Sequence, residues 1–204
     1  MTAQTNQALA PIALDPHEGE ALWFNNDLLI LKATGAQTAG AYLLVEEVAR
    51  QGKVTPLHTH PAEQETFYVL EGEALIHLDG DERSLAAGSL VSVPPGVPHA
   101  YLVTSEVARS LVLITPGSGA MEKFFREAGE PAAERVLPEP GPLDMQRIGA
   151  AAERTRAVQV LGPPPFGESG ACTPSATVLL GYLPTRTRKS FVGAPWTGSI
   201  TNAG

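Results

Sequence analysis

Three histidines and one glutamate have the residue types and the spacing that best fit chemistry in this sequence. His58 and His60 lie two residues apart, Glu65 follows across the turn 61–64, and His99 comes about forty residues later. Residues two apart on a β-strand project from the same face, so the two imidazoles point the same way. Strands folded back on one another would bring all four side chains together. Three imidazole nitrogens and one carboxylate oxygen suit one divalent transition ion (Ni, Fe, Mn, Co, Cu or Zn) with positions open for water, substrate or dioxygen.

The other two histidines fit ordinary structural roles. His17 falls in an N-terminal stretch without hydrophobic periodicity, and His77 falls on the strand face opposite Ile76, close to acidic residues. A single histidine on an apolar face is usually structural. A purely structural origin for the other three histidines and the glutamate would require four coincidences at set spacings, so we interpret those four residues as metal ligands.

Short β-strands are the elements that must position these residues. Eight runs rich in Val, Leu, Ile, Tyr and Phe are separated by Gly, Pro, Asn and Asp: Ala21–Phe24, Asp27–Ala33, Ala41–Glu47, Thr66–Leu70, Glu73–Asp79, Ser89–Val93, His99–Thr104 and Ser110–Thr115. Their regular spacing predicts an all-β barrel or sandwich. Asp79-Gly80-Asp81 predicts a hairpin, in which Ala74, Ile76 and Leu78 share one strand face.

Two helices are predicted after the strands. Four apolar residues at helical spacing form one stripe: Met121, Phe124, Phe125 and Ala128. Ser118 is the expected N-cap of this helix, and Gly129 is its expected end. A weaker helix is predicted from Leu143 to Arg154.

The chain divides into four expected segments. We expect an N-terminal arm over residues 1–20, a barrel over 21–116, a helical extension packed on the barrel over 117–162, and an irregular tail over 163–204. The tail is rich in Pro, Gly, Ser and Thr and holds one strand-like patch, Ala176–Leu183.

The composition argues against several classes of protein. Fourteen Lys and Arg against 22 Asp and Glu give a net charge of −8, which disfavours a nucleic-acid partner held through its phosphates. The single cysteine, Cys172, excludes an intramolecular disulfide framework and a cysteine-rich zinc module. No Lys or Arg precedes Lys32, and no apolar run reaches membrane-spanning length. We expect a soluble, cytoplasmic protein with no membrane partner.

The pattern around the four ligands resembles the two sequence motifs of the cupin superfamily. The first motif matches at every defined position and reads Gly52-x5-His58-x-His60-x4-Glu65-x6-Gly72. The second reads Gly88-x5-Pro94-x-Gly96-x2-His99, with Val103 where the family has an asparagine. That departure removes a contact outside the ligands and leaves the ligands themselves unchanged. The resemblance implies the cupin double-stranded β-helix, a small jelly-roll barrel, followed here by C-terminal helices and an irregular tail.

A narrower resemblance, over about residues 20–165, is to single-domain bacterial quercetin 2,3-dioxygenases. It rests on Glu65-Thr66-Phe67-Tyr68, His99-Ala100-Tyr101, Met121-Glu122-Lys123-Phe124-Phe125, Gly129-Glu130-Pro131-Ala132 and Leu161-Gly162-Pro163-Pro164. It implies a metal-dependent dioxygenase that cleaves a flavonol, or a similar enolisable aromatic compound, with O2. It also implies that Glu65 is both a ligand and the catalytic base. Glu65 takes the proton of the enol-like hydroxyl, and the anion then reacts with dioxygen with loss of carbon monoxide.

Five further side chains are expected around the substrate. Phe67, Val69 and Tyr101 share strand parity with the ligands and should point into the barrel. Met121 and Phe125, on the first predicted helix, are expected to close the barrel mouth. Simple core packing is the alternative for all five residues.

Two other functions stay open. One is a metal-dependent isomerase, cyclase or lyase that acts on an enolisable, polyketide-like compound. The other is a non-catalytic cupin that binds a small molecule. A requirement for O2 separates the dioxygenase from the first alternative, and any turnover excludes the second.

A homodimer is the expected assembly. Cupin barrels commonly pair through their sheets, and the backbone groups of the patch Ala176–Leu183 need a partner.

Overall fold

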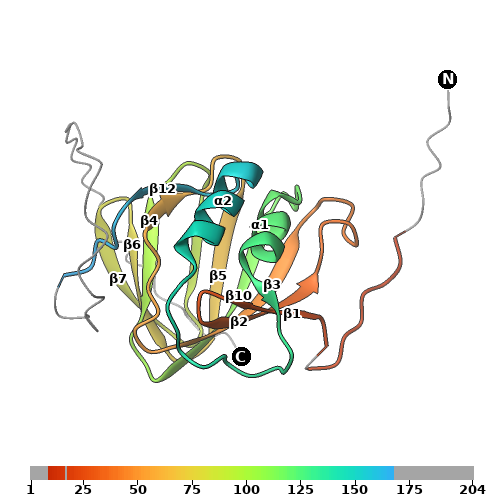
Figure 1. Cartoon of the computed structure of the whole chain (residues 1–204), viewed down its shortest axis with the longest axis horizontal. Coiled ribbons are helices and arrows are strands. Elements are labelled where there is room, and N and C mark those ends of the chain that lie inside the picture. Colours follow the sequence, from red (N-terminus) through yellow and green to blue (C-terminus); the bar gives the residue numbers. More distant parts are fainter. Residues whose placement is uncertain (1–8, 17, 168–204) are drawn as a thin grey trace, which may run out of the picture. The chain divides into compact units, whose positions relative to one another are not determined.

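The computed structural model describes residues 9–16 and 18–167 of the 204-residue chain (Figure 1). Within these residues the strands before the first helix are β1 (Glu20–Phe24), β2 (Asp27–Ala33), β3 (Leu43–Arg50), β4 (Leu57–Thr59), β5 (Gln64–Glu71), β6 (Glu73–Leu78), β7 (Asp81–Ala86), β8 (Leu90–Val93), β9 (His99–Val103) and β10 (Val107–Thr115). They are followed by α1 (Ala120–Ala128), β11 (Glu130–Pro131), α2 (Met145–Thr155) and β12 (Gln159–Gly162). His17, Cys172 and the predicted patch Ala176–Leu183 lie outside the described residues.

The strands form two antiparallel sheets. One has the order β11-β1-β2-β3-β10-β5-β8, and the other has the order β12-β4-β9-β6-β7. Strands that are distant in sequence pair within them, because β3 and β5 both pair with β10 and β4 pairs with β9. The core between them includes Leu43, Val45, Ile76, Val93 and Ile114. The predicted all-β fold, a small jelly-roll barrel with helices after it, is confirmed.

Strand β5 shows how the sequence specifies the barrel wall. Glu65, Phe67 and Val69 are buried, whereas Tyr68 and Leu70 between and after them are exposed. This period of two places one set of side chains inside the barrel and the other in solvent. A polar glutamate therefore occupies an inward position of the strand.

The predicted hairpin is present between β6 and β7. Leu78 lies opposite Asp81, and the turn residues Asp79 and Gly80 both have positive φ values, of 50° and 99°. Two consecutive residues with positive φ are typical of the tight turn that matches the twist of paired strands. Ile76 is buried on the expected face.

Strands β11 and β12 were not predicted, and β4 and β7 were implied by the spacing of His58 and His60 and by the hairpin but were given no bounds. Strand β7 has an exposed, largely polar sequence, and β4 and β11 contain only three and two residues. Such segments carry no hydrophobic alternation, and they become strands because a neighbouring strand supplies the hydrogen bonds.

The N-cap of helix α1 lies one residue later than predicted. Its N-cap is Gly119, with φ 86° and no side-chain cap, and Ser118 instead donates a hydrogen bond to Glu63. The prediction of Ser118 as N-cap was therefore wrong, because the helix starts one residue later and Ser118 Oγ accepts only a long hydrogen bond of 3.4 Å from the Ala120 N–H. Gly129 ends the helix as predicted. Helix α2 is capped by Asp144, whose Oδ1 accepts a hydrogen bond of 2.9 Å from the Arg147 N–H.

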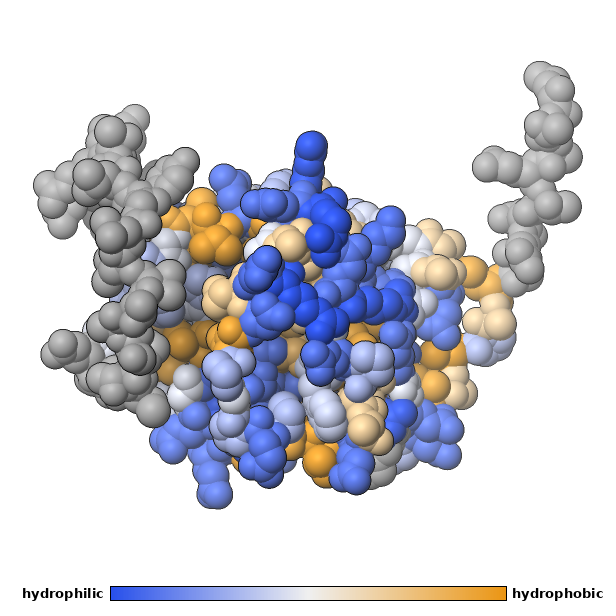
Figure 2. Space-filling model, in the orientation of Figure 1, coloured by the Kyte–Doolittle hydropathy of each residue, from blue (hydrophilic) through white to orange (hydrophobic). Residues whose placement is uncertain are grey.

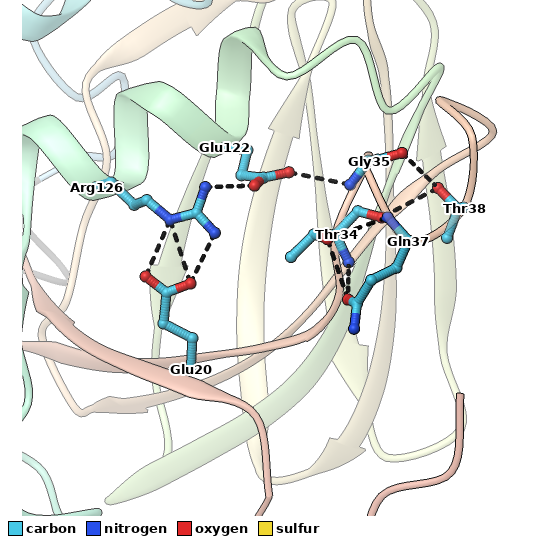
Figure 3. Close-up of polar contacts among 7 residues, drawn as sticks. All are labelled: Glu20, Thr34, Gly35, Gln37, Thr38, Glu122 and Arg126. Atoms are coloured by element: carbon cyan, nitrogen blue, oxygen red, sulfur yellow. Dashed lines mark hydrogen bonds and ion pairs between the residues drawn. The ribbon is translucent and has the colours of Figure 1, made fainter. Parts of the chain in front are cut away.

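A network of polar contacts attaches α1 to the barrel (Figure 3). The Gly35 N–H donates to Glu122 Oε2 over 3.0 Å, and Arg126 pairs with both Glu122 and Glu20. Glycine is required at this position, since a Cβ on residue 35 would lie 2.3 Å from the Gly117 carbonyl oxygen. Helix α1 is thereby held by the loop that follows β2 and by the start of β1.

The face shown in Figure 2 is largely hydrophilic, with small hydrophobic groups separated from one another. In the described part of the chain, no helix combines the length and the apolar character that crossing a membrane requires.

Candidate metal centre

The structure brings together the four side chains that the sequence singled out. His58 lies on β4 directly opposite His99 of β9, His60 follows the end of β4, and Glu65 is near the start of β5. One ligand atom from each lies within 4.8 Å of the ligand atoms of the others, and all four residues are buried. This is a donor set of three imidazoles and one carboxylate, drawn from strands β4, β5 and β9 and from the residue that follows β4.

Backbone carbonyls fix the orientation of all three imidazoles. Each Nδ1 donates a hydrogen bond: His58 to the Pro56 oxygen at 2.8 Å, His60 to the Ala157 oxygen at 2.9 Å, and His99 to the Val97 oxygen at 3.0 Å. A carbonyl oxygen can only accept, so each Nδ1 must carry the proton. In the neutral ring, Nε2 then has a free lone pair, which is the form that binds a metal ion.

Glu65 supplies negative charge at the centre of the cluster. Its Oε2 lies 3.2 Å from His60 Nε2 and 3.1 Å from His99 Nε2. Burial raises the pKa of Glu65, but the neighbouring His60 and His99 outweigh burial and hold that pKa well below its usual range. The carboxylate is therefore ionised at neutral pH.

The histidines differ in their electrostatic surroundings. Burial, followed by the nearby His99, lowers the pKa of His58 to about 4, so this ring is neutral at pH 7. Burial also lowers the pKa of His60, but the charge of Glu65 outweighs burial and raises it overall. His60 Nε2 is buried and makes no hydrogen bond among the described residues. Imidazole lone pairs that face a carboxylate need a cation between them, so these residues fit a divalent metal ion.

A cavity of about 360 Å³ adjoins the cluster, and its lining includes His58, His60 and Glu65. Most of the remaining wall is apolar. Four of the five side chains that the sequence placed around a substrate line it: Phe67, Tyr101, Met121 and Phe125. Helix α2 completes one side with Ile148 and Ala152. The cavity is within the size range of small-molecule sites, which are typically ~300–1,000 Å³.

Val69 does not line this cavity, contrary to the prediction. It lies beside a separate cavity of about 20 Å³, together with Ile76 and Leu85. The alternation of side chains along β5 correctly predicted that Val69 points into the barrel. Alternation does not show how far along the strand the cavity extends. Val69 belongs to the packed core beyond the end of the large cavity.

Glu47 and Lys53 also line the large cavity, and the sequence analysis did not identify them. Tyr101 donates a hydrogen bond of 2.5 Å to Glu47 Oε1, and Lys53 Nζ lies 3.6 Å from the same oxygen. Lys53 also forms an ion pair with the buried Asp27. A usable signal was present, because Glu47 has the inward parity of Leu43 and Val45 on β3.

Burial shifts the pKa values of Glu47 and Lys53 toward each other. Burial raises the pKa of Glu47 to about 7, against a lowering by the Tyr101 hydrogen bond and with a further rise from the charge of Glu65, and burial lowers the pKa of Lys53 to about 7. In both cases the loss of water disfavours the charged form.

The chain returns to the centre after α2. Strand β12 pairs with β4, with Val160 opposite His58, and the Ala157 carbonyl just before it holds His60. These contacts come from the backbone, so no residue type signals them in the sequence.

Comparison with known proteins agrees with this geometry. The cupin domain family matches residues 44–115. The chain is 32% identical over 139 residues to quercetin 2,3-dioxygenase of Bacillus subtilis, covering 68% of this chain and 41% of that protein. It is 33% identical over 94 residues to an uncharacterized protein of Streptomyces coelicolor, covering 42% of this chain and 90% of that protein.

A solved structure of an RmlC-like cupin from Shewanella frigidimarina has a TM-score of 0.44 and 20% identity, and the match covers 50% of this chain and 88% of that one. The chain spans less than half the length of three of the four curated relatives that it matches. The domain match and the sequence relatives show that the chain belongs to the cupin superfamily.

Proposed function

We propose that the chain is a metal-dependent dioxygenase of the quercetin 2,3-dioxygenase type, which uses O2 to cleave a flavonol or a similar enolisable aromatic compound. One observation carries the proposal: a cluster of four metal donors, three of which line the cavity wall, adjoins a largely apolar cavity of about 360 Å³. The similarity to the Bacillus subtilis quercetin 2,3-dioxygenase supports the choice of reaction.

His58, His60, Glu65 and His99 would hold one divalent transition ion, drawn from Ni, Fe, Mn, Co, Cu and Zn. When bound, such an ion acts as a Lewis acid on a coordinated hydroxyl and keeps an oxygen ligand close to the substrate. The orientation of the imidazoles does not depend on the ion, because backbone carbonyls already fix the three rings.

The cavity walls bind and orient the substrate. Phe67 and Tyr101 on the strands, with Met121 and Phe125 on α1, provide a hydrophobic surface for a flat aromatic compound. Helix α1 is attached to the barrel through Glu122 (Figure 3), so it also excludes water from that side of the cavity.

Glu65 moves the proton. Its carboxylate borders the cavity, where it accepts the proton of the enol-like hydroxyl of the substrate. The resulting electron-rich anion reacts with dioxygen, and the heterocycle opens with loss of carbon monoxide.

Oxygen uptake and carbon monoxide release on flavonols test this proposal. Protein loaded with each of the six ions is mixed with a flavonol, and with the same flavonol methylated on its enol hydroxyl as the control. We expect equal amounts of O2 consumed and CO released with the free flavonol, and neither with the methylated one. Conversion at the same rate without O2 would instead indicate an isomerase or lyase. Metal-loaded protein that binds the flavonol and converts none of it would indicate a binding protein.

A further inference from the structure

A second polar group lines the cavity, and the proposed reaction does not use it. Glu47 lies on β3, Lys53 follows the end of that strand, and Tyr101 lies on β9. The side chains of Glu47 and Lys53 are only 12% and 6% exposed. Charged residues are seldom buried beside an apolar cavity without a partner or a ligand.

In the backbone, this group lies farther along the barrel than the candidate metal centre, although the charge of Glu65 still acts on Glu47 and Tyr101. In the first sheet Glu47 pairs with Ser110, which pairs with Val69, whereas Glu65 pairs with Ile114. Val69 and Glu65 are four residues apart on β5, which corresponds to ~13 Å along the strand. The cavity therefore has two polar regions with aromatic and aliphatic walls between them.

The contacts within the group leave hydrogen-bonding capacity unused. Glu47 Oε1 accepts from Tyr101, while Oε2 makes no hydrogen bond or ion pair among the described residues. The Lys53 ammonium has three N–H donors and contacts two carboxylates there, those of Asp27 and Glu47. One acceptor and one donor thus stay available close to each other.

This combination matches a neutral hydroxyl better than an anion. A hydroxyl donates one hydrogen bond and accepts others, so it can satisfy Glu47 and Lys53 together. A carboxylate or phosphate would be repelled by Glu47, and the charge of Lys53 is already balanced by Asp27. An apolar ring edge at the same place would leave both buried groups unsatisfied.

We propose that Glu47 and Lys53, positioned by Tyr101 and Asp27, form a recognition site for a phenolic hydroxyl on the part of the substrate farthest from its enol group. The inference rests on the proposed function and adds a substrate class to it: flavonol-like compounds with a hydroxylated outer ring. The four candidate metal ligands hold one end of the substrate, and this site selects the other end.

Two flavonols that differ by one phenolic hydroxyl on the outer ring provide the test. We expect the wild-type protein to prefer the hydroxylated compound by ~10- to 100-fold in kcat/KM, because the other compound leaves buried polar groups unpaired. Glu47→Gln should reduce this preference to about threefold or less, mainly through KM for the hydroxylated compound, with metal content unchanged. Glu46→Gln is the matched control, since Glu46 is the adjacent glutamate on β3 and pairs with Lys32 and Arg109, outside the cavity lining.

Lys53→Met is a second variant, with the same expected loss of preference. It leaves Asp27 buried without its cation and destabilises the fold, so Glu47→Gln decides the question if Lys53→Met does not fold. The affinity for each flavonol is also measured without O2, by following the absorbance of the flavonol as it binds to metal-loaded protein. This measurement needs no turnover.

Equal kcat/KM and equal affinity for the two flavonols in the wild-type protein would overturn the recognition site and leave the dioxygenase intact. A folded Glu47→Gln protein that keeps the full wild-type preference for the hydroxylated flavonol would also overturn the recognition site and leave the dioxygenase intact. Absence of both binding and turnover with either flavonol would overturn the proposed function, and this inference with it.

Discussion

Glu65 has two roles in the proposed reaction, as a ligand and as a base, and these roles make different chemical demands. A ligand needs an oxygen lone pair, whereas a base needs proton affinity. The carboxylate oxygen Oε2 lies 3.1–3.2 Å from two imidazole nitrogens, and its charge is maintained by those rings despite burial. A carboxamide keeps the shape and an oxygen but has almost no basicity, so one substitution separates the two roles.

Glu65→Gln should retain measurable metal and lose ~10²–10⁴-fold in turnover, because three imidazoles supply most of the affinity for late transition ions. Metal analysis and flavonol turnover measure the two effects. A bound flavonol should also fail to show the red-shifted absorbance of its anion. Glu71→Gln, at the exposed end of the same strand, is the control. A metal-loaded Glu65→Gln protein with near wild-type turnover would show that Glu65 is not the base.

The cluster of His58, His60, Glu65 and His99 was predictable because the first three residues are close in sequence and all four match the spacing of the cupin motifs. Three other contributors were not predicted. Glu47 has inward parity, but its partner Lys53 lies beyond the strand and reaches Tyr101 only in the folded barrel. The Ala157 carbonyl that orients His60 is a backbone atom, so no residue type marks it. The metal-ligand roles of the four residues stay a prediction.

At the scale of elements, strands with apolar alternation were predictable and polar edge strands were not. Strand β5 alternates clearly, whereas β7 is exposed except at Leu85 and β12 has no buried residue. Whether such a segment becomes a strand depends on pairing with a neighbouring strand. That pairing cannot be predicted from a short stretch of sequence. A distant contact also involves Ser118, whose hydroxyl donates a hydrogen bond to Glu63, 55 residues away.

The polar contacts that attach α1 include one buried hydrogen bond, from the Gly35 N–H to Glu122. Glu122→Ala should reduce the free energy of unfolding by ~1–3 kcal/mol, because it leaves that N–H without its acceptor. Chemical denaturation measures the change. Glu127→Ala on the same helix removes only an exposed ion pair with Arg154 and should cost ~1 kcal/mol or less. Equal losses from the two substitutions would contradict the role given to Glu122.

Glu46 links β3 to its two neighbours through Lys32 and Arg109. Burial raises the pKa of Glu46, but the hydrogen bonds from Arg109 and Lys32 outweigh burial and lower it below its ordinary value of 4.5. A carboxyl with a lowered pKa in the folded state contributes stability above the unfolded pKa and loses it as the pH falls through the folded pKa.

The wild-type protein should therefore lose more stability than Glu46→Gln between about pH 5 and pH 3. Urea denaturation at both pH values measures the difference. Parallel losses in the two proteins would show that Glu46 does not contribute to the acid sensitivity.

At the scale of the whole molecule, the assembly stays a prediction. The patch Ala176–Leu183 lies outside the described residues, but β8 forms one edge of the larger sheet and carries Leu90, which is 63% exposed. An edge strand with an exposed apolar side chain favours pairing with a second copy. Light scattering should give twice the 21.4 kDa mass of one chain over a tenfold concentration range. A monomeric mass throughout that range would contradict the homodimer.

Metal content tests the central claim, that His58, His60, Glu65 and His99 form one metal site, most directly. The purified wild-type protein should carry one divalent transition ion per chain. His99→Ala should abolish that occupancy, because it removes one of three imidazoles whose Nε2 atoms converge. His77→Ala, which removes a histidine from β6 outside the cluster, should keep it. Full stoichiometric metal in the His99→Ala protein would contradict the three-histidine, one-glutamate site.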